Sequence, residues 1–298
     1  MKKQIIFGFL LFAGNVEAQN DSLTQVSFNK IYNDHTALVV NRTWTSDTTT
    51  QSLGWGWRRV ANKFEISPEG KTTYLLARRQ IKRGLGFALG GLGLVLGSVP
   101  VATSMPNNGN DFSLKAGVAL GMTFGGIASF IVASRNSTRA ANNFEQAVWL
   151  RNRDAIVVNL PYTVQAEFKQ IYAQETIYLG HMSFGNGYIK NNRKQKFGLL
   201  GKLGQSEFEN SVLGWDSYKK FQRTQRAGLA VYVVGAATML SSVFAISRSN
   251  SNPNLVLYVG GAVLTGIGGS IMNTANIHLR QAIYLRNRDV LGRLLANQ

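Results

Sequence analysis

Few residues in this sequence have the types and spacing that catalysis or metal binding requires. The histidines, His35, His181 and His278, are far apart and share no metal-ligand spacing, and there is no cysteine to supply a thiolate. The acidic residues are scattered, and neither a phosphate-binding loop nor a nucleophile elbow is present. The segment GLGFALGG has the letters of a dinucleotide-binding loop, but a basic helical segment precedes it where a strand is needed. We therefore expect no catalytic residue, no metal site and no cofactor, and a protein that is not an enzyme.

One motif is written twice, as VWLRNRD at 148–154 and as IYLRNRD at 283–289. A pair of arginines can bind an anionic ligand, but nothing nearby supplies a complementary reactive group. Two structural interpretations are open. In the first, the motif is the outer end of an amphipathic helix on a membrane surface. In the second, it is the C-terminal segment of a helix, where the helix dipole favours the arginines and Asp154 or Asp289 pairs locally.

The motif closes a longer repeat. The segment TQVSFNKIY at 24–32 resembles TVQAEFKQIY at 163–172, and YLLARRQIKRGLG at 74–86 resembles YKKFQRTQRAGLA at 218–230. The spacing between matched segments changes little along the chain. The sequence therefore predicts a tandem duplication with units at about 19–163 and 164–298.

Each unit contains two long stretches without Asp, Glu, Lys or Arg, at 84–110 and 116–134 and again at 227–247 and 249–279. Their apolar cores of about 18 to 22 residues are long enough to cross about 30 Å of hydrocarbon. The turns between paired stretches are rich in Asn, Ser and Pro, which favours hairpins. The alternative is a set of helices buried in a large soluble core.

We expect a mainly α membrane protein with four transmembrane spans, in which each unit is a small basic α/β module followed by a transmembrane helical hairpin. Alternation of apolar and polar residues predicts short strands in the modules, and SPEG at 67–70 is expected to form a turn. The expected domains are a signal peptide (1–18), basic module 1 (19–83), hairpin 1 (84–134), an amphipathic tail and linker (135–163), basic module 2 (164–226), hairpin 2 (227–275) and an amphipathic tail (276–298).

Glycine is concentrated in the apolar stretches, although it costs about 1 kcal/mol per position relative to Ala in a soluble helix. In lipid, a stripe of small residues lets two helix backbones approach closely. Helical spacing selects the expected packing glycines, which are Gly86, Gly90, Gly93, Gly97, Gly117, Gly121, Gly125, Gly261 and Gly269. This pattern resembles the glycine-zipper helical hairpins of bacterial envelope membrane proteins. The resemblance covers only the four apolar cores and implies no activity.

The net charge of +17 calls for an anionic partner, either nucleic acid or lipid headgroups. No nucleic-acid-binding motif is present and the basic clusters adjoin the apolar spans, so we expect anionic lipid headgroups and not nucleic acid. Cations and amphipathic rings at span ends are expected to face headgroups. These residues are Arg78, Arg79, Lys82, Arg83, Trp149, Arg151, Arg153, Lys219, Lys220, Arg223, Arg226, Tyr284, Arg286 and Arg288.

The N-terminus has the layout of a secretory signal peptide, with Lys2 and Lys3, an apolar run at 5–13 and small residues up to a cleavage point at Ala18. A buried strand or an uncleaved anchor are the alternatives. A cleaved signal places the modules on the non-cytoplasmic side of a bacterial envelope, whereas the positive-inside tendency would place them in the cytoplasm. We favour the signal, because the positive-inside tendency applies to short loops.

Two functions fit these features. The first is a non-enzymatic integral membrane protein of the bacterial envelope with a structural or interaction role, whose partners are a second copy of the chain or another envelope protein. The alternative is a small channel or transporter built from two hairpin repeats and lined by Thr123, Ser129, Thr238 and Ser242. Against the alternative, ion pathways usually place ionisable groups within the membrane, and the apolar cores contain no Asp, Glu, Lys or Arg.

Overall fold

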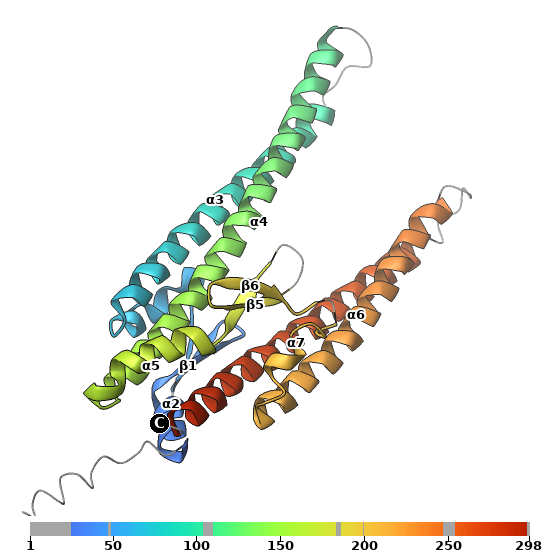
Figure 1. Cartoon of the computed structure of the whole chain (residues 1–298). Helices are drawn as coiled ribbons and strands as arrows, with labels where there is room; N and C mark the ends of the chain where they lie inside the picture. The colour runs from blue at the N-terminus through green and yellow to red at the C-terminus, as the bar shows by residue number, and fades with distance from the viewer. Residues whose placement is uncertain are drawn as a thin grey trace, which may run out of the picture.

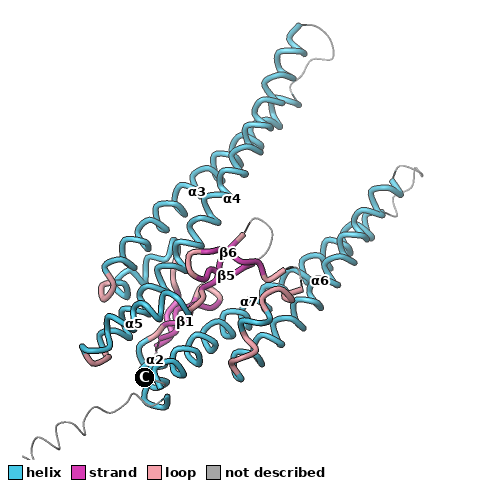
Figure 2. Tube along the Cα trace, viewed as in Figure 1, coloured by secondary structure: helices cyan, strands magenta, loops and turns pink. Residues whose placement is uncertain are grey.

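A computed structural model describes residues 25–46, 49–103, 110–182, 186–198, 200–246 and 254–296, so the expected signal peptide lies outside the described residues. The chain is mostly helical and has two small antiparallel sheets (Figures 1 and 2). The elements of the first half are α2 (Gln25–His35), β1 (Ala37–Val40), β2 (Thr43–Ser46), β3 (Thr49–Ser52), η1 (Trp55–Phe64), α3 (Pro68–Thr103) and α4 (Asn110–Val158). Those of the second half are α5 (Tyr162–Glu175), β4 (Tyr178–His181), β5 (Asn186–Lys190), β6 (Arg193–Lys196), η2 (Gln205–Glu207), α6 (Val212–Ile246) and α7 (Asn254–Ala296).

Two long helical hairpins dominate the molecule. Helix α3 packs along α4, and α6 packs along α7. At 1.5 Å per residue, the 49 residues of α4 extend over about 73 Å, more than twice the thickness of a hydrocarbon core. Each long helix runs unbroken across an expected domain boundary, so modules and hairpins share their helices. We call 84–134 and 227–275 the arms, and the remainder of the described chain the platform. Both arms extend from the platform toward the same side of the molecule (Figure 1).

A small residue at every seventh position lets the paired helices pack closely. In α3 these are Gly70, Ala77, Gly84, Gly91 and Ser98, and in α4 they are Ala119, Gly126, Ala133, Ala140 and Ala147. A Cβ atom on Gly91 would lie 2.9 Å from the Gly126 carbonyl oxygen, and one on Gly84 would lie 3.2 Å from that of Ala133. The second hairpin repeats the arrangement with Gly228 against Gly268 and Gly235 against Gly261. A seven-residue repeat of this kind predicts a left-handed supercoil.

The segment SPEG begins a helix and is not a turn, which corrects the prediction. Pro68 occupies the first helical position of α3, where a missing N–H costs nothing. The Ser67 hydroxyl accepts a 3.0 Å hydrogen bond from the Gly70 N–H and so caps the helix. In the second half, the Ser211 hydroxyl accepts the same bond from Gly214 at the start of α6.

The two sheets each have three strands, in the orders β1-β2-β3 and β4-β5-β6. The alternating segments at 36–44 and 175–189, from which strands were predicted, contain β1 and β4 and parts of β2 and β5, whereas β3 and β6 lie outside them. Two residues, Asn41 and Arg42, join β1 to β2, and both have positive φ values, 49° and 59°. This is the conformation of a type I′ turn, which suits the twist of a two-strand ribbon but is strained for a residue such as Arg42.

Two helices are long and apolar enough to cross a membrane by length and composition, at 68–101 and 115–158. Within the described residues, α6 and α7 do not meet the same criteria. Residues 247–253, between these helices, lie outside the described residues. Two of the four expected spans therefore have this support.

Candidate functional site

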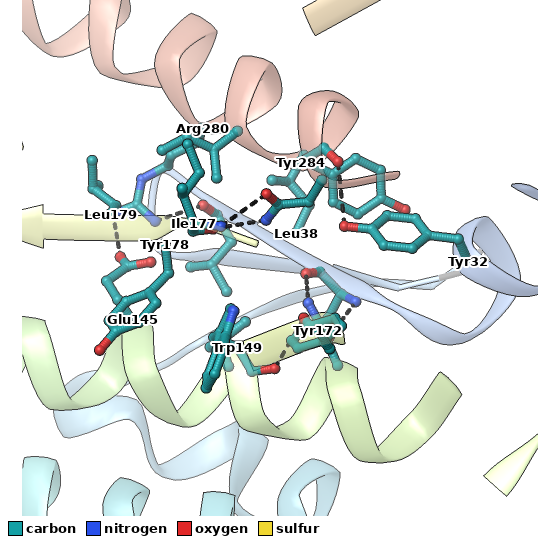
Figure 3. A pocket seen from close by; sticks show the side chains of 16 residues that line it. Tyr32, Leu38, Glu145, Trp149, Tyr172, Ile177, Tyr178, Leu179, Arg280 and Tyr284 are labelled. Atoms are coloured by element: carbon teal, nitrogen blue, oxygen red, sulfur yellow. Dashed lines mark hydrogen bonds and ion pairs between the residues drawn. The ribbon is translucent and has the colours of Figure 1, made fainter. Parts of the chain in front are cut away.

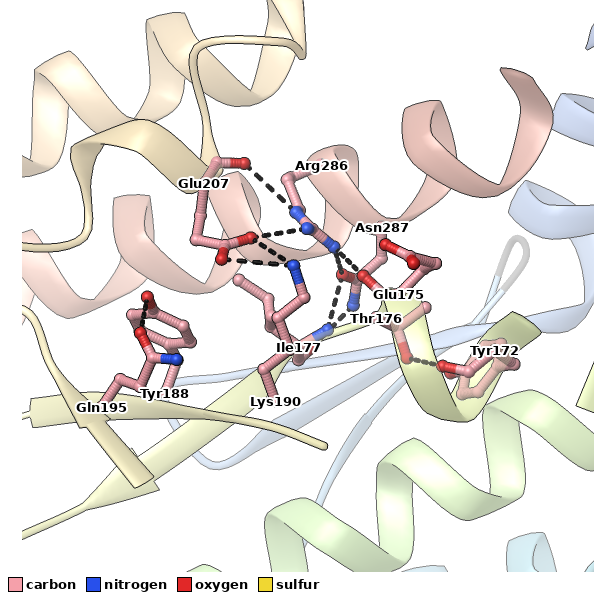
Figure 4. Close-up of polar contacts among 10 residues, drawn as sticks. All are labelled: Tyr172, Glu175, Thr176, Ile177, Tyr188, Lys190, Gln195, Glu207, Arg286 and Asn287. Carbon is pink, nitrogen blue, oxygen red and sulfur yellow. Dashed lines mark hydrogen bonds and ion pairs between the residues drawn. The ribbon is translucent and has the colours of Figure 1, made fainter. Parts of the chain in front are cut away.

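The first arginine of each LRNRD copy donates hydrogen bonds to backbone carbonyl oxygens at the ends of distant segments. Arg151 Nη1 donates a 2.5 Å hydrogen bond to the His35 carbonyl oxygen at the end of α2, and Arg151 Nε donates to the Lys63 carbonyl oxygen at 3.3 Å. Arg286 makes the matching bonds to the carbonyl oxygens of Glu175 and Glu207 (Figure 4). Carbonyls at a helix end lack intrahelical partners, so each guanidinium satisfies groups that would otherwise be unpaired.

Arg286 is only 3% exposed and also forms a 2.7 Å ion pair with Glu207, which accepts from Lys190 at 3.1 Å (Figure 4). Burial lowers the pKa of Arg286, and the charge of Glu207 opposes that shift. Burial likewise lowers the pKa of Arg151. Both guanidinium groups remain protonated, because arginine is not deprotonated in proteins. They serve as fixed hydrogen-bond donors inside the protein.

The asparagine of each motif copy pairs with a strand. Asn152 accepts a 2.8 Å hydrogen bond from the Ala37 N–H and donates one of 2.8 Å to the Ala37 carbonyl oxygen at the start of β1. Asn287 does the same to Ile177, at 3.0 and 2.7 Å (Figure 4). Each amide thus completes both backbone bonds of one buried residue. The recurrence of Asn at the same place in both motif copies was the sequence signal for this role.

The motif's aspartates anchor the helix starts. Asp154 accepts a 2.5 Å bond from the Ser67 hydroxyl, and Asp289 accepts a 2.7 Å bond from Ser211. The preceding arginines, Arg153 and Arg288, pair with these carboxylates at 2.8 and 3.0 Å. This agrees with the interpretation in which the aspartates pair locally. Each copy of the motif therefore joins α2 or α5, the first strand of a sheet, and the start of α3 or α6.

The two halves also exchange contacts with each other. Tyr32 of α2 donates a 3.2 Å bond to the Tyr284 carbonyl oxygen, and Tyr172 of α5 donates a 3.1 Å bond to the Trp149 carbonyl oxygen. The sequence repeat pairs Tyr32 with Tyr172 and Trp149 with Tyr284, so the two bonds are equivalent. The Phe28 and Phe168 rings, which the repeat also pairs, meet with centroids 6.1 Å apart. The halves contact each other as the subunits of a two-fold dimer do.

Glu145 and Arg280 lie where the halves meet, at positions that the repeat also pairs (Figure 3). Arg280 Nη2 contacts Glu145 Oε1 at 2.5 Å, and Arg280 Nη1 donates to the Val39 carbonyl oxygen at 3.1 Å. Burial would raise the pKa of Glu145, but the charge of Arg280 and a hydrogen bond with His181 lower it overall. The neighbouring cavity between β1, β4, α4 and α7 has a volume of about 60 Å³. This is room for about two waters and not for an organic ligand.

The structure corrects part of the predicted headgroup-facing set. The motif residues Arg151, Arg153, Arg286 and Arg288, together with Trp149 and Tyr284, are buried or half-buried within the platform and bonded there. Arg78 is half-buried, with its guanidinium 5.8 Å from the centre of the Tyr74 ring. The exposed members of the set lie at the feet of the arms, and these are Arg79, Lys82, Arg83, Lys219, Lys220, Arg223 and Arg226.

The predicted packing glycines divide into two groups. Gly97, Gly125 and Gly261 face the partner helix, whereas a Cβ atom would meet open space at Gly86, Gly90, Gly93, Gly117, Gly121 and Gly269. The second group does not face the paired helix of its own hairpin, because helical spacing identifies residues on one face without identifying which face meets that helix. The seven-residue recurrence of Gly, Ala and Ser was the signal that would have found Gly91 and Gly126.

The polar residues named as a pore lining are engaged in the helices. Thr123 donates to the Ala119 carbonyl oxygen at 2.9 Å and contacts the Ser98 hydroxyl at 3.2 Å. Ser129 and Thr238 each donate to the carbonyl oxygen four residues earlier. The side chain of Ser242 lies outside the described residues.

Among the described residues there is no group of three or more His, Cys, Asp or Glu side chains that would hold a metal ion. The chain was also compared with protein-family models, with curated proteins and with solved structures, and none of the three comparisons gave a match.

Proposed function

We propose that this chain is a non-enzymatic integral membrane protein, in which two helical hairpins are embedded in a bilayer and the platform outside the bilayer fixes their spacing. The observation that carries the proposal is the exposure of large apolar side chains around the arms. Leu89 is 61% exposed, Phe124 66% and Leu240 60%. Soluble proteins rarely leave apolar surface of this extent in water. If the arms are surrounded by lipid, the unfavourable free energy of exposing these side chains to water is avoided.

The proposal includes all four spans. Hairpin 1 contains the two helices with the length and composition of spans. Hairpin 2 is proposed to insert for the same reason of exposure, since Val233, Val234, Val259 and Val263 are each more than half exposed. Small residues at the helix contacts are typical of association in lipid, where van der Waals packing of close backbones drives pairing.

A tandem duplication is part of the proposal, and its support is the matching of bonds between halves. The helix caps of Ser67 and Ser211, the strand contacts of Asn152 and Asn287, and the backbone bonds of the paired arginines occur at positions that the sequence repeat aligns. One ancestral module with a hairpin, joined to its copy, accounts for all of them.

A scaffold role fits the use that the platform makes of its charged groups. Four charged side chains within the platform are buried or half-buried, and each is bonded to backbone or to another charged group. They are Arg151, Arg286, Glu145 and Glu207. These contacts support a structural role and leave no free reactive group among them. We place the protein in a bacterial envelope with the platform on the non-cytoplasmic side, on the strength of the signal-like residues 1–18.

Membrane fractionation tests insertion, and protease protection tests topology. The proposal expects the full chain to sediment with membranes after an alkaline wash and to need detergent for release. It also expects a C-terminal tag to be digested from the outer side of spheroplasts, while tags in the turns at 104–109 and 247–253 are protected. A folded monomer in the supernatant without detergent would overturn the proposal.

A further inference from the structure

A cavity at the foot of the first arm has a volume of about 470 Å³. Its walls are one side of α3 (Ile81 to Ala88), one side of α4 (Ser137 to Glu145), the β1–β2 turn and the segment from Leu53 to Arg58. His181 and Arg280 also line it. Sites of a few hundred cubic ångströms are typical for small ligands.

The charge of this cavity is strongly positive. Its described lining contains Arg42, Arg58, Lys82 and Arg280 but only one carboxylate, Glu145. Arg280 and Glu145 neutralise each other at 2.5 Å. None of the ion pairs in the described part of the chain involves the other three cations. Three uncompensated positive charges therefore surround one opening.

The wall of the cavity changes from polar to apolar along α3. Lys82 is the last cation on this wall, and Gly84, Leu85 and Ala88 continue it into the arm. Trp55 also lines the cavity and is 73% exposed. An amphipathic ring beside cations at the start of an apolar span is the arrangement found at headgroup depth. A ligand that fits has an anionic end and an apolar end.

The backbone at the rim holds one of these cations in a costly conformation. Arg42 has φ 59°, a left-handed value that glycine or asparagine adopts more readily, and its carbonyl oxygen accepts a 2.8 Å bond from the Leu53 N–H. Gly56 and Trp57, which also line the cavity, have positive φ values too, 58° and 60°. A non-glycine residue in this region is strained. The β1–β2 turn imposes this conformation on Arg42, and the two-residue turn between β5 and β6 of the second sheet has Asn192, at φ 58°, where the first has Arg42.

We infer that this cavity binds the phosphate headgroup of an anionic phospholipid, with Arg42, Arg58 and Lys82 around the phosphate and the acyl chains along the arm. The inference rests on the proposed membrane insertion, since lipid reaches the cavity only if the arm is embedded. Guanidinium groups form paired hydrogen bonds with phosphate oxygens, and lysine adds a point charge. Trp55 lies beside the glycerol region, and Leu85 and Ala88 lie beside the first methylene groups.

Binding of a fluorescent phosphatidylglycerol to the full-length protein in a neutral detergent tests the inference. The variants Arg42→Gly, Arg58→Gln and Lys82→Gln are measured singly and together. A cation near a lipid surface contributes about 1 kcal/mol, so each single change is expected to weaken binding about fivefold and the triple change about a hundredfold. The matched control is the triple change Arg193→Gln, Lys194→Gln and Lys196→Gln, which removes the same charge from exposed positions of β6. It is expected to alter binding less than twofold.

Arg42→Gly separates binding from folding. Glycine relieves the left-handed strain, so this variant is expected to melt at the same temperature as the wild type or higher while binding lipid more weakly. Arg42→Lys keeps the charge and is expected to retain most of the affinity. Equal loss of affinity in the pocket and control triples would overturn the inference, since it would show general charge attraction.

Competitors distinguish the sources of the phosphate. Unlabelled phosphatidylglycerol is expected to displace the probe, while phosphatidylcholine, glycerol phosphate and inorganic phosphate at the same concentration are not. Displacement by inorganic phosphate as effective as that by lipid would overturn the lipid assignment in favour of a free phosphate site. Membrane fractionation distinguishes failure of the proposed insertion from failure of the proposed lipid site. A protein that inserts but binds lipid equally well after the triple change refutes the cavity alone, and a soluble protein refutes the insertion.

Discussion

Replacement of Asn287 by alanine tests whether the repeated motif stabilises the platform. The Asn287 amide is 4% exposed and forms both available backbone bonds of Ile177, at 3.0 Å to the N–H and 2.7 Å to the carbonyl oxygen. Alanine would leave both groups buried without partners. Each unsatisfied buried group costs about 1–3 kcal/mol, so we expect a loss of about 3 kcal/mol in the free energy of unfolding. For a chain of this size, that corresponds to a melting temperature lower by about 6–12 °C.

The assay is thermal melting of the full chain in detergent, followed by tryptophan fluorescence. Asn152→Ala removes the equivalent pair of bonds to Ala37, both 2.8 Å, and is expected to cost a similar amount. The control is Asn159→Ala, because Asn159 directly follows α4, is exposed and donates its side-chain bond to the Ala155 carbonyl oxygen of that helix. That change is expected to stay within about 0.5 kcal/mol of the wild type. If Asn287→Ala also stays within about 0.5 kcal/mol of the wild type, the motif does not stabilise the platform through these bonds.

Three further predictions address the arms and the contact between halves. Gly91→Ala places a Cβ atom 2.9 Å from a facing carbonyl oxygen and should destabilise hairpin 1 by about 1–3 kcal/mol, whereas Gly90→Ala, which meets open space, should melt at or above the wild-type temperature. Equal melting of the two variants would contradict the assigned helix contact. Phe124→Lys puts a charge on the exposed face of an arm at a cost of about 2.5–3.5 kcal/mol and should reduce the membrane fraction, while Leu203→Lys, on the platform and 70% exposed, should not. Because the pKa of Glu145 is lowered in the folded protein, its stabilising contribution is present above the ordinary glutamate pKa of about 4.3 and is lost as the pH falls through the folded value. Glu145→Gln should therefore lower the melting temperature at neutral pH and flatten its decline on the acid side, and an unchanged acid limb would show that another carboxylate dominates there.

The sequence predicted those parts of the fold that depend on local patterns. Alternating apolar residues located β1 with β2 and β4 with β5, and the charge-free stretches located the arms. Helix starts were harder to predict, because residue types such as Ser67 and Pro68 are common both in turns and at helix N-termini. The segment after Pro68 decides between the two, because it forms a helix long enough to run from the platform into the arm.

Contacts between distant segments were not predictable from the same patterns. An arginine near a helix end has the same local appearance whether it faces lipid or binds a backbone carbonyl. Arg286 binds the carbonyl oxygen of Glu175, more than a hundred residues away, and only the fold brings the two together. The orientation of the outward glycines relative to the paired helix was not predictable for a related reason. A stripe such as Gly86 and Gly90 defines a helix face, but the position of the partner depends on both helices.

Glu145 and Arg280 show how the proposed duplication bears on the assembly of the molecule. In a dimer of identical modules, the same residue would approach its own copy where the two modules meet, and two glutamates or two arginines would repel each other. The present chain has opposite charges at these paired positions, 2.5 Å apart, and the arginine also reaches the Val39 carbonyl oxygen. The two halves are therefore no longer interchangeable at this contact. The same pair lines the cavity at the foot of the first arm, so the contact at which the halves differ also borders the proposed lipid site.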